Sequence, residues 1–311
     1  MNLLVSDPTN IAYLTGFVSV SPQAREAYAL VTPGTTYLFT NSLYTEQAKT
    51  LGFPIIEISL DNPLSNQLKR TLKGKRLAFE EADITVSEYN TLKKNFTLVP
   101  TRNRVEALRM IKRHDEIENI RKAVNLTDAC FRYITPLLKP GVSESQIAWE
   151  IESFIRKHGA TLAFTPIVAF NKHSSQPHYQ GMGSGLGISK GLTPPALVLL
   201  DFGARVNGYC GDMTRVVFVG RPKNEWVRAY KTVLSAQQRA LDALANGERS
   251  GAKLDRIART HIEKAGFVPY SHSLGHAVGL DIHEAPRLTI KKDEPLKPGM
   301  VFSIEPAIYL E

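Results

Sequence analysis

The chain has few cysteines and no long apolar run, and each absence excludes a class of protein. Only Cys130 and Cys210 occur among 311 residues. They lie far apart without C-x-x-C spacing, so neither a disulfide framework nor a thiolate metal site is expected. No apolar stretch approaches the ~18 residues that span a bilayer, and the N-terminus lacks the pattern of a cleaved signal peptide. These absences predict a cytoplasmic protein without a membrane partner.

The chain has a net positive charge, but its basic residues are not clustered as in a nucleic-acid-binding site. The formal net charge is +8, and basic residues are spread along the chain. The densest run, residues 68–76, lacks the interleaved aromatic side chains that stack on bases. We therefore expect a solvated surface and no nucleic-acid partner, with a nucleic-acid or acidic-partner patch at this run as the alternative. A hydrophobic content of 43% is ordinary for globular proteins, and the length favours two domains.

Residues 201–218 carry the first chemical signal. The apolar run 196–200 predicts a buried strand that ends at Asp201. Asn207 and Gly208 predict a two-residue type I′ turn, since both positions need positive φ. The register of that turn sets Thr214 opposite Asp201 and leaves Asp201 and Asp212 as diagonal neighbours, about 7–8 Å apart at the backbone. A one-residue bulge would turn one acid away, and two solvated hairpin acids remain the alternative for the pair alone.

Two segments further along the chain add ligand-type side chains. Residues 273–284 are punctuated by glycines and contain His276 and His283. Residues 300–306 predict another short apolar strand, and it presents Glu305. Two Asp, one His and one Glu form an oxygen-rich set with one imidazole, which suits Mn²⁺, Co²⁺, Fe²⁺ or Zn²⁺.

The order of these motifs resembles that of the pita-bread metallopeptidases of family M24, in the group of Xaa-Pro dipeptidase (prolidase) and Xaa-Pro aminopeptidase. An Asp, a second Asp eleven residues on, Gly-His-x-x-Gly and Ile-Glu-Pro follow one another as in that family. The resemblance implies that Asp201, Asp212, His276 and Glu305 bind two divalent ions, with Mn²⁺ expected first and Co²⁺, Fe²⁺ or Zn²⁺ as alternatives. The family's fifth ligand is a bridging Glu on the following strand, and the chain stops at Glu311, so we expect a truncated catalytic domain.

The resemblance also implies roles in hydrolysis of the Xaa-Pro bond of dipeptides or peptide N-termini by a bridging hydroxide. Glu305 would carry the proton. His283 and His178, the latter in a Pro-His phrase like the family's, would bind substrate and stabilise developing charge. His272 would line the pocket or support a ligand, with a purely structural role as the alternative. Thr214 is a natural hydrogen-bond donor to the ligand carboxylate opposite it.

The expected fold is α+β, with a creatinase-like α/β domain at residues 1–106 and a pita-bread domain at 107–311. Residues 7–17 resemble the Asn-Ile-x-Tyr-Leu-Thr-Gly-Phe stretch of the family's N-terminal domain, which implies a homodimer. Predicted strands of this domain lie at residues 2–5, 28–32, 36–40, 55–58 and 76–79. Long helices are predicted at 114–138, from 144 to before Gly159, and at 224–246. The last is expected to bury Val227, Tyr230, Leu234, Leu241 and Leu244.

Specific residues argue for or against three other functions: phosphate or dinucleotide binding, metal-free hydrolysis and binding without catalysis. The glycine-rich residues 180–192 predict a flexible loop, because they lack both the Gly-Lys-Ser/Thr ending of a P-loop and dinucleotide-site spacing. Metal-free creatinase-like hydrolases lack the acids present here. A pita-bread binding module that has lost catalysis remains the alternative, because a chain without the bridging Glu would behave as one.

Overall fold

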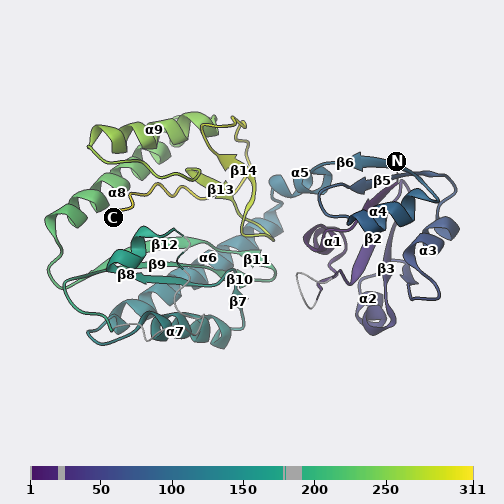
Figure 1. Ribbon diagram of the computed structural model, residues 1–311, viewed down its shortest axis with the longest axis horizontal. Helices are drawn as coiled ribbons and strands as arrows, with labels where there is room; N and C mark the ends of the chain where they lie inside the picture. Colours follow the sequence, from purple (N-terminus) through teal and green to yellow (C-terminus); the bar gives the residue numbers. More distant parts are fainter. Residues whose placement is uncertain (1, 20–24, 178, 180–190, 311) are drawn as a thin grey trace. The chain divides into compact units, whose positions relative to one another are not determined.

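The computed structural model describes residues 2–19, 25–177, 179 and 191–310. Its internal contacts divide the chain into two compact units, Met1–Arg109 and Met110–Glu311 (Figure 1). The predicted boundary at residues 106/107 falls inside helix α5 (Arg104–Met110). Within the described ranges, no helix combines the length and apolar character needed to cross a bilayer.

The first unit is built on a six-stranded mixed sheet in the order β4-β3-β2-β1-β5-β6. Its strands are β1 (Leu3–Val5), β2 (Ala27–Val31), β3 (Thr36–Thr40), β4 (Ile55–Glu57), β5 (Arg76–Glu80) and β6 (Thr97–Thr101). The helical segments are α1 (Pro8–Thr15), η1 (Ser42–Tyr44), α2 (Thr45–Lys49), α3 (Leu64–Thr71), α4 (Val86–Lys93) and α5. The five predicted strands are confirmed. The sixth, β6, was missed because Pro100 interrupts its apolar pattern, which a strand at the sheet edge tolerates.

A buried polar network fixes the start of α1 in this unit. Glu80 accepts hydrogen bonds from the backbone N–H groups of Ser6 and Asp7 and from the side-chain amide of Asn10, at 2.7 to 2.9 Å. Arg109 donates to the side-chain oxygen of Asn10 at 2.7 Å. Because a buried carboxylate is costly unless it is hydrogen-bonded, these contacts explain why the polar residues of this stretch are retained inside the unit.

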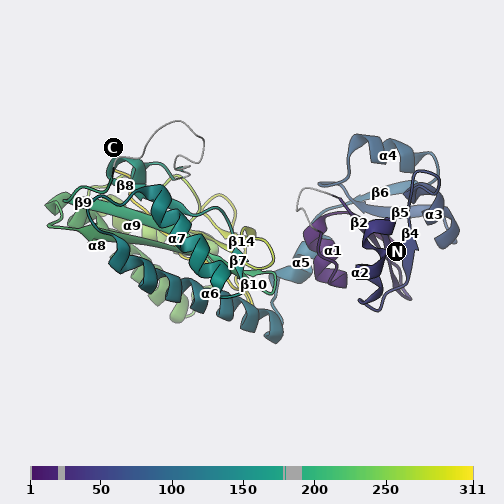
Figure 2. The same cartoon turned by 90° about the horizontal axis from the view of Figure 1, so that it is seen from below.

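The second unit has helices on both sides of short strands. Its helices are α6 (His114–Ile134), α7 (Glu144–Lys157), α8 (Asn224–Ala245) and α9 (Gly251–Lys264), with η2 (Thr135–Leu137) and η3 (Asn171–Ser175). Its strands are β7 (Thr161–Leu162), β8 (Ile167–Phe170), β9 (Ala196–Phe202), β10 (Ala204–Val206), β11 (Tyr209–Cys210), β12 (Met213–Val219), β13 (Gly275–Ala277) and β14 (Glu284–Leu288). They pair as β12-β9-β8, β11-β10-β7 and β13-β14. In Figures 1 and 2, α6 and α7 cover one side of the β12-β9-β8 sheet, and α8 and α9 lie on the other side.

The core under β9 follows from two periodicities in the sequence. Alternate residues of β9, Val198, Leu200 and Phe202, are fully buried, and they join one cluster with Ile147 and Ile151 of α7. A capping box begins α7: the Ser143 hydroxyl accepts from Gln146 N–H, and Gln146 Oε1 accepts from Ser143 N–H. This core holds β9 rigidly at the strand end that carries Asp201.

The predicted core face of α8 is wrong for three of its five residues, whereas Val227 and Leu244 are half-buried and Leu244 packs against the core cluster of this helix. Tyr230, Leu234 and Leu241 are 42%, 52% and 40% exposed. The residues that α8 buries are small: Ala229, Thr232, Ala236 and Ala240. Ala236 and Ala240 belong to one cluster with residues of α9, and small side chains let two helix backbones approach closely. Leucine and tyrosine on the neighbouring face gave the stronger sequence signal but do not form this contact.

Candidate metal centre

The hairpin that carries both aspartates has the predicted register. Thr214 pairs with Asp201, and Arg205 with Cys210 on the turn side. Asn207 has φ 49° and its neighbour Gly208 has φ 84°, so both central turn positions are in the left-handed region that a type I′ turn requires. No residue is added to either strand, and the two aspartates therefore stay close enough for their charges to interact.

His276 and Glu305, the other two predicted ligands, come from neighbouring backbone segments. His276 lies in β13, and the segment that carries Glu305 runs beside it. Ser303 N–H donates to His276 C=O at 2.9 Å, and Glu305 N–H donates to Leu274 C=O at 2.7 Å. The predicted regular strand at residues 300–306 is wrong, because within it only Phe302 forms a β-bridge, to Ala277. The segment nevertheless runs antiparallel to residues 274–278, since Val278 N–H also donates to Val301 C=O at 3.1 Å.

Asp212, His276 and Glu305 converge. One candidate ligand atom from each lies within 4.8 Å of the other two. The Nε2 atom of His276 is 3.2 Å from Glu305 Oε1 and 3.5 Å from Asp212 Oδ2. Its other nitrogen, Nδ1, is 3.2 Å from the carbonyl oxygen of Ala277. A proton on Nδ1 would be donated to that carbonyl, which leaves the lone pair of Nε2 directed at the acids, as in metal-binding histidines.

The electrostatics show an excess of negative charge in a buried place. Burial, together with the charges of Asp212 and Glu305, raises the pKa of Asp201 to about 7. Burial and the charge of Glu305 raise the pKa of Asp212 to about 6. Carboxylates with such neighbours resist ionisation unless a cation joins them. The single imidazole of His276 cannot balance three acids.

His276 and Glu305 stabilise each other's charged forms. Burial acts against the charge on both residues, but the pKa of His276 is raised by its hydrogen bond to Glu305. The pKa of Glu305 is lowered by the same contact and by Ser303. The donor set consists of carboxylate oxygens and one directed imidazole nitrogen. It therefore fits divalent cations such as Mn²⁺, Fe²⁺, Co²⁺ or Zn²⁺.

The remaining predicted site residues differ in how the structure places them. His283 is exposed and stacks edge-on against His276, with ring centroids 4.4 Å apart. His272 Nε2 lies 3.0 Å from the hydroxyl oxygen of Tyr309, and its charge contributes to lowering the pKa of Glu305. Thr214 donates to the Asp201 carboxylate and so lowers its pKa against the effect of burial. His178 lies outside the described residues.

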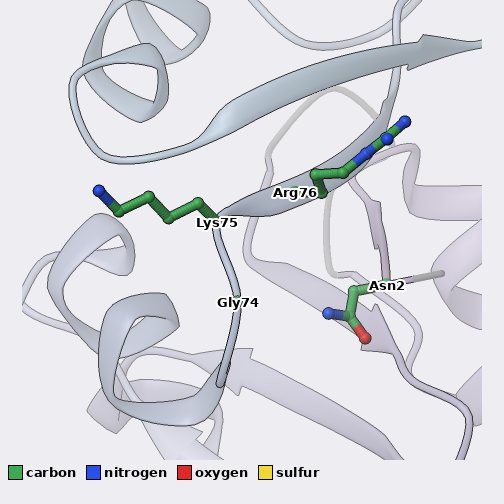
Figure 3. Close-up of a pocket in the computed structure, with 4 residues that line it drawn as sticks. All are labelled: Asn2, Gly74, Lys75 and Arg76. Atoms are coloured by element: carbon green, nitrogen blue, oxygen red, sulfur yellow. The ribbon is translucent and has the colours of Figure 1, made fainter.

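A cavity in the first unit does not contribute to this cluster. It has a volume of about 500 Å³ and is lined by Asn2, Gly74, Lys75 and Arg76. Figure 3 shows the side chains of Lys75 and Arg76 pointing in opposite directions. Their charges therefore do not converge on a common point, although they lie in the densest basic run of the sequence.

Comparisons with known proteins identify both units. Residues 118–311 match metallopeptidase family M24. The chain belongs to metallopeptidase family M24. Residues 2–111 match the creatinase/prolidase N-terminal domain, so a creatinase-type domain precedes an M24 pita-bread domain. M24 is a family of peptidases that use divalent metal ions, which agrees with the donor chemistry of the cluster.

Relatives of this M24 metallopeptidase span nearly all of the chain. The uncharacterized peptidase YqhT of Bacillus subtilis is 36% identical over 99% of this chain and 86% of its own length. The Xaa-Pro dipeptidase from Bacillus anthracis is 33% identical with a TM-score of 0.87, covering 99% of this chain and 86% of that one. The X-Pro aminopeptidase from Thermotoga maritima is 30% identical with a TM-score of 0.87, covering 100% and 88%.

Two residues near the cluster of Asp212, His276 and Glu305 were not predicted from the sequence. Ser303 donates from its hydroxyl to Glu305 Oε1 at 3.0 Å, and the hydroxyl also lies 3.1 Å from the backbone nitrogen of His276. Ser303 precedes Glu305 by two residues, so strand alternation could have indicated it. Burial, with the charges of Glu305 and Asp201, raises the pKa of Tyr309 to about 12. No periodic signal indicated Tyr309, because its segment is irregular.

Proposed function

We propose that this M24 metallopeptidase hydrolyses the Xaa-Pro bond of dipeptides or peptide N-termini. Asp201, Asp212, His276 and Glu305 are the proposed ligands of two divalent ions. The observation that carries the proposal is the convergence of Asp212, His276 and Glu305 within 4.8 Å. Support for the substrate class comes from solved structures of similar fold that are described as an X-Pro aminopeptidase, an Xaa-Pro dipeptidase and a prolidase.

The substrate class has a chemical reason. An Xaa-Pro bond is a tertiary amide without an N–H group, so a protease that grips its substrate as a strand handles it poorly. Bound divalent ions supply a Lewis acid for the scissile carbonyl and lower the pKa of an attacking water. A site of this kind needs no hydrogen bond from the substrate amide that is cleaved.

The residues of the chain supply proton transfer and charge stabilisation. Glu305 takes a proton from the attacking water and returns it to the leaving nitrogen, while Ser303 orients its carboxylate through the 3.0 Å hydrogen bond. His283 and His178 stabilise the negative charge that develops on the carbonyl oxygen. Thr214 keeps the Asp201 carboxylate in position through its hydroxyl. His272 lines the pocket together with Tyr309.

The test is a refilling experiment on the full-length enzyme. After chelation, the protein receives Mn²⁺ and the dipeptide Leu-Pro, and release of proline is measured. We expect hydrolysis that Asp212→Asn abolishes and that Asp115→Asn, an exposed aspartate in α6, leaves unchanged. No release of proline with Mn²⁺, Co²⁺, Fe²⁺ or Zn²⁺ would refute the proposal. Comparison with a longer Xaa-Pro peptide separates dipeptidase from aminopeptidase activity.

The proposal includes the resident metal and the assembly. Mn²⁺ is proposed first because carboxylate oxygens dominate the ligand set. A homodimer in the cytoplasm is proposed from the resemblance of the N-terminal domain and from the sparse cysteines. Elemental analysis of the protein as purified, sedimentation analysis and cell fractionation measure these three properties separately.

A further inference from the structure

A buried ion pair lies directly beside His283. Lys112 Nζ is 3.0 Å from Glu284 Oε2, and the two side chains are only 1% and 6% exposed. Lys112 comes from the segment between α5 and α6, whereas Glu284 is the first residue of β14. Buried ion pairs contribute little net stability, because the desolvation of two charges offsets their attraction. The role of this pair is therefore sought in the geometry that it fixes rather than in stability.

The Glu284 carboxylate organises the loop that carries His283. Its Oε1 accepts a hydrogen bond from Asp281 N–H at 3.2 Å. It also lies against Gly279, since a Cβ at residue 279 would be 2.4 Å from the same oxygen. The backbone of Lys112 is itself held, because its N–H donates to Gly299 C=O at 2.8 Å. Lys112 therefore anchors the Glu284 side of the loop.

The opposite side of the loop is tied to the aspartate hairpin. Arg205 Nη1 donates to Leu280 C=O at 2.6 Å. Cys210 N–H donates to Gly279 C=O at 2.8 Å. These contacts hold residues 279 and 280, and Ile282 packs against the cluster that contains Tyr209 and Val278. The Glu284 carboxylate adds a side-chain anchor at Asp281, on the other side of His283. His283 itself is exposed, so burial of its own side chain cannot fix its position.

We propose that the Lys112–Glu284 ion pair positions His283, by holding residues 281–284 so that the His283 ring stays against His276 for catalysis. Lys112 and Glu284 are thus positioning residues that act through His283. The catalytic consequence rests on the proposed Xaa-Pro hydrolysis, whereas the ring geometry can be measured without it. A displacement of a catalytic group by about 1 Å can cost as much as 100-fold in rate.

The activity test compares two lysines that each pair with a glutamate. Lys112→Met is expected to lower kcat/KM for Leu-Pro by about 10- to 100-fold, with the loss in kcat because His283 acts on the transition state. Bound Mn²⁺ should match the wild type. The control, Lys292→Met, removes an exposed pair with Glu294 and should stay within about twofold of wild type. Equal activities of Lys112→Met and wild type would overturn the proposal.

A double variant separates positioning from stability. Lys112→Met leaves the buried Glu284 carboxylate without its lysine, and Lys112→Met/Glu284→Gln then removes that charge. We expect the melting temperature to recover in the double variant while kcat/KM stays low, since neither variant restores the link to residue 284. Recovery of activity together with stability would show a merely structural role and overturn the proposal.

The third measurement needs neither metal nor substrate. In histidine-labelled, metal-free protein, the 4.4 Å stacking of His276 and His283 should give a nuclear Overhauser effect between the rings, assigned with His283→Gln. We expect the effect to disappear in Lys112→Met and to persist in Lys292→Met. Its persistence in both variants would refute the inference. If wild-type protein cleaves no Xaa-Pro peptide, the proposed function fails, while this measurement still decides the role of Lys112.

Discussion

Gly203 allows the two sides of the aspartate hairpin to approach closely, and Gly203→Ala should disrupt them. A Cβ at residue 203 would lie 1.8 Å from the carbonyl oxygen of Gly211 and 2.8 Å from its carbonyl carbon. Real Cβ contacts essentially never fall below 3.0 Å, so the backbones must separate by at least 1.2 Å, the difference between 3.0 and 1.8 Å. The obstacle is backbone rather than a flexible side chain, and Gly211 directly precedes Asp212.

The cost of that separation can be estimated and measured. Overpacking of this kind costs about 3 kcal/mol, which corresponds to a fall of roughly 6–12 °C in the melting temperature of a unit of this size. Calorimetry measures the fall, and titration calorimetry with Mn²⁺ should show weaker binding because Asp201 and Asp212 are moved apart. Gly251→Ala is the control: its Cβ would make only ordinary contacts, the nearest at 3.4 Å. A melting temperature of Gly203→Ala within about 2 °C of wild type would refute the reasoning.

Two further predictions concern Ser303 and Glu88. Ser303→Ala removes the hydroxyl that contacts Glu305 and the backbone of His276; Mn²⁺ affinity measured by calorimetry should fall about 10-fold, and unchanged affinity and kcat would contradict this role. Burial opposes ionisation of Glu88, but hydrogen bonds from Arg25, Thr85 and Tyr28 outweigh it and hold its pKa at about 2, below the ordinary value of 4.5. Because the folded-state pKa is depressed, Glu88 stabilises the fold above about pH 4.5, and this contribution is lost as the pH falls towards 2. The melting temperature should therefore drop less between pH 5 and pH 3 in Arg25→Gln than in wild type; equal drops would show that Arg25 does not set this pKa.

Local sequence patterns were sufficient for the hairpin and for most elements. Two positive-φ positions in succession specify a two-residue turn, and the turn alone then sets which residue faces Asp201. The capping box at Ser143 and the alternation in β9 are likewise properties of neighbouring residues. For this reason the register of Asp201 and Thr214 could be predicted from the sequence.

The face that α8 buries depended on another helix. Leu234 and Leu241 form a clear apolar stripe, but the contact with α9 selected Ala236 and Ala240 because small side chains permit a close approach. The path of residues 301–305 likewise depends on residues 274–278, with which its backbone forms hydrogen bonds. Neither partner's position is encoded in the periodicity of the segment itself.

For the candidate metal centre too, some features follow from the sequence and others from packing. Residue chemistry and the hairpin pattern indicated Asp201, Asp212 and Glu305 as ligand-type side chains, and the resemblance to the pita-bread family singled out His276 rather than His283. The direction of His276 Nε2 towards Asp212 and Glu305 depends on packing between distant segments. The same holds for the contacts of Ser303 with Glu305, of Tyr309 with His272 and of Lys112 with Glu284. Those contacts join residues that are distant in the chain or lie in irregular segments, and distances of that kind follow from packing rather than from local pattern.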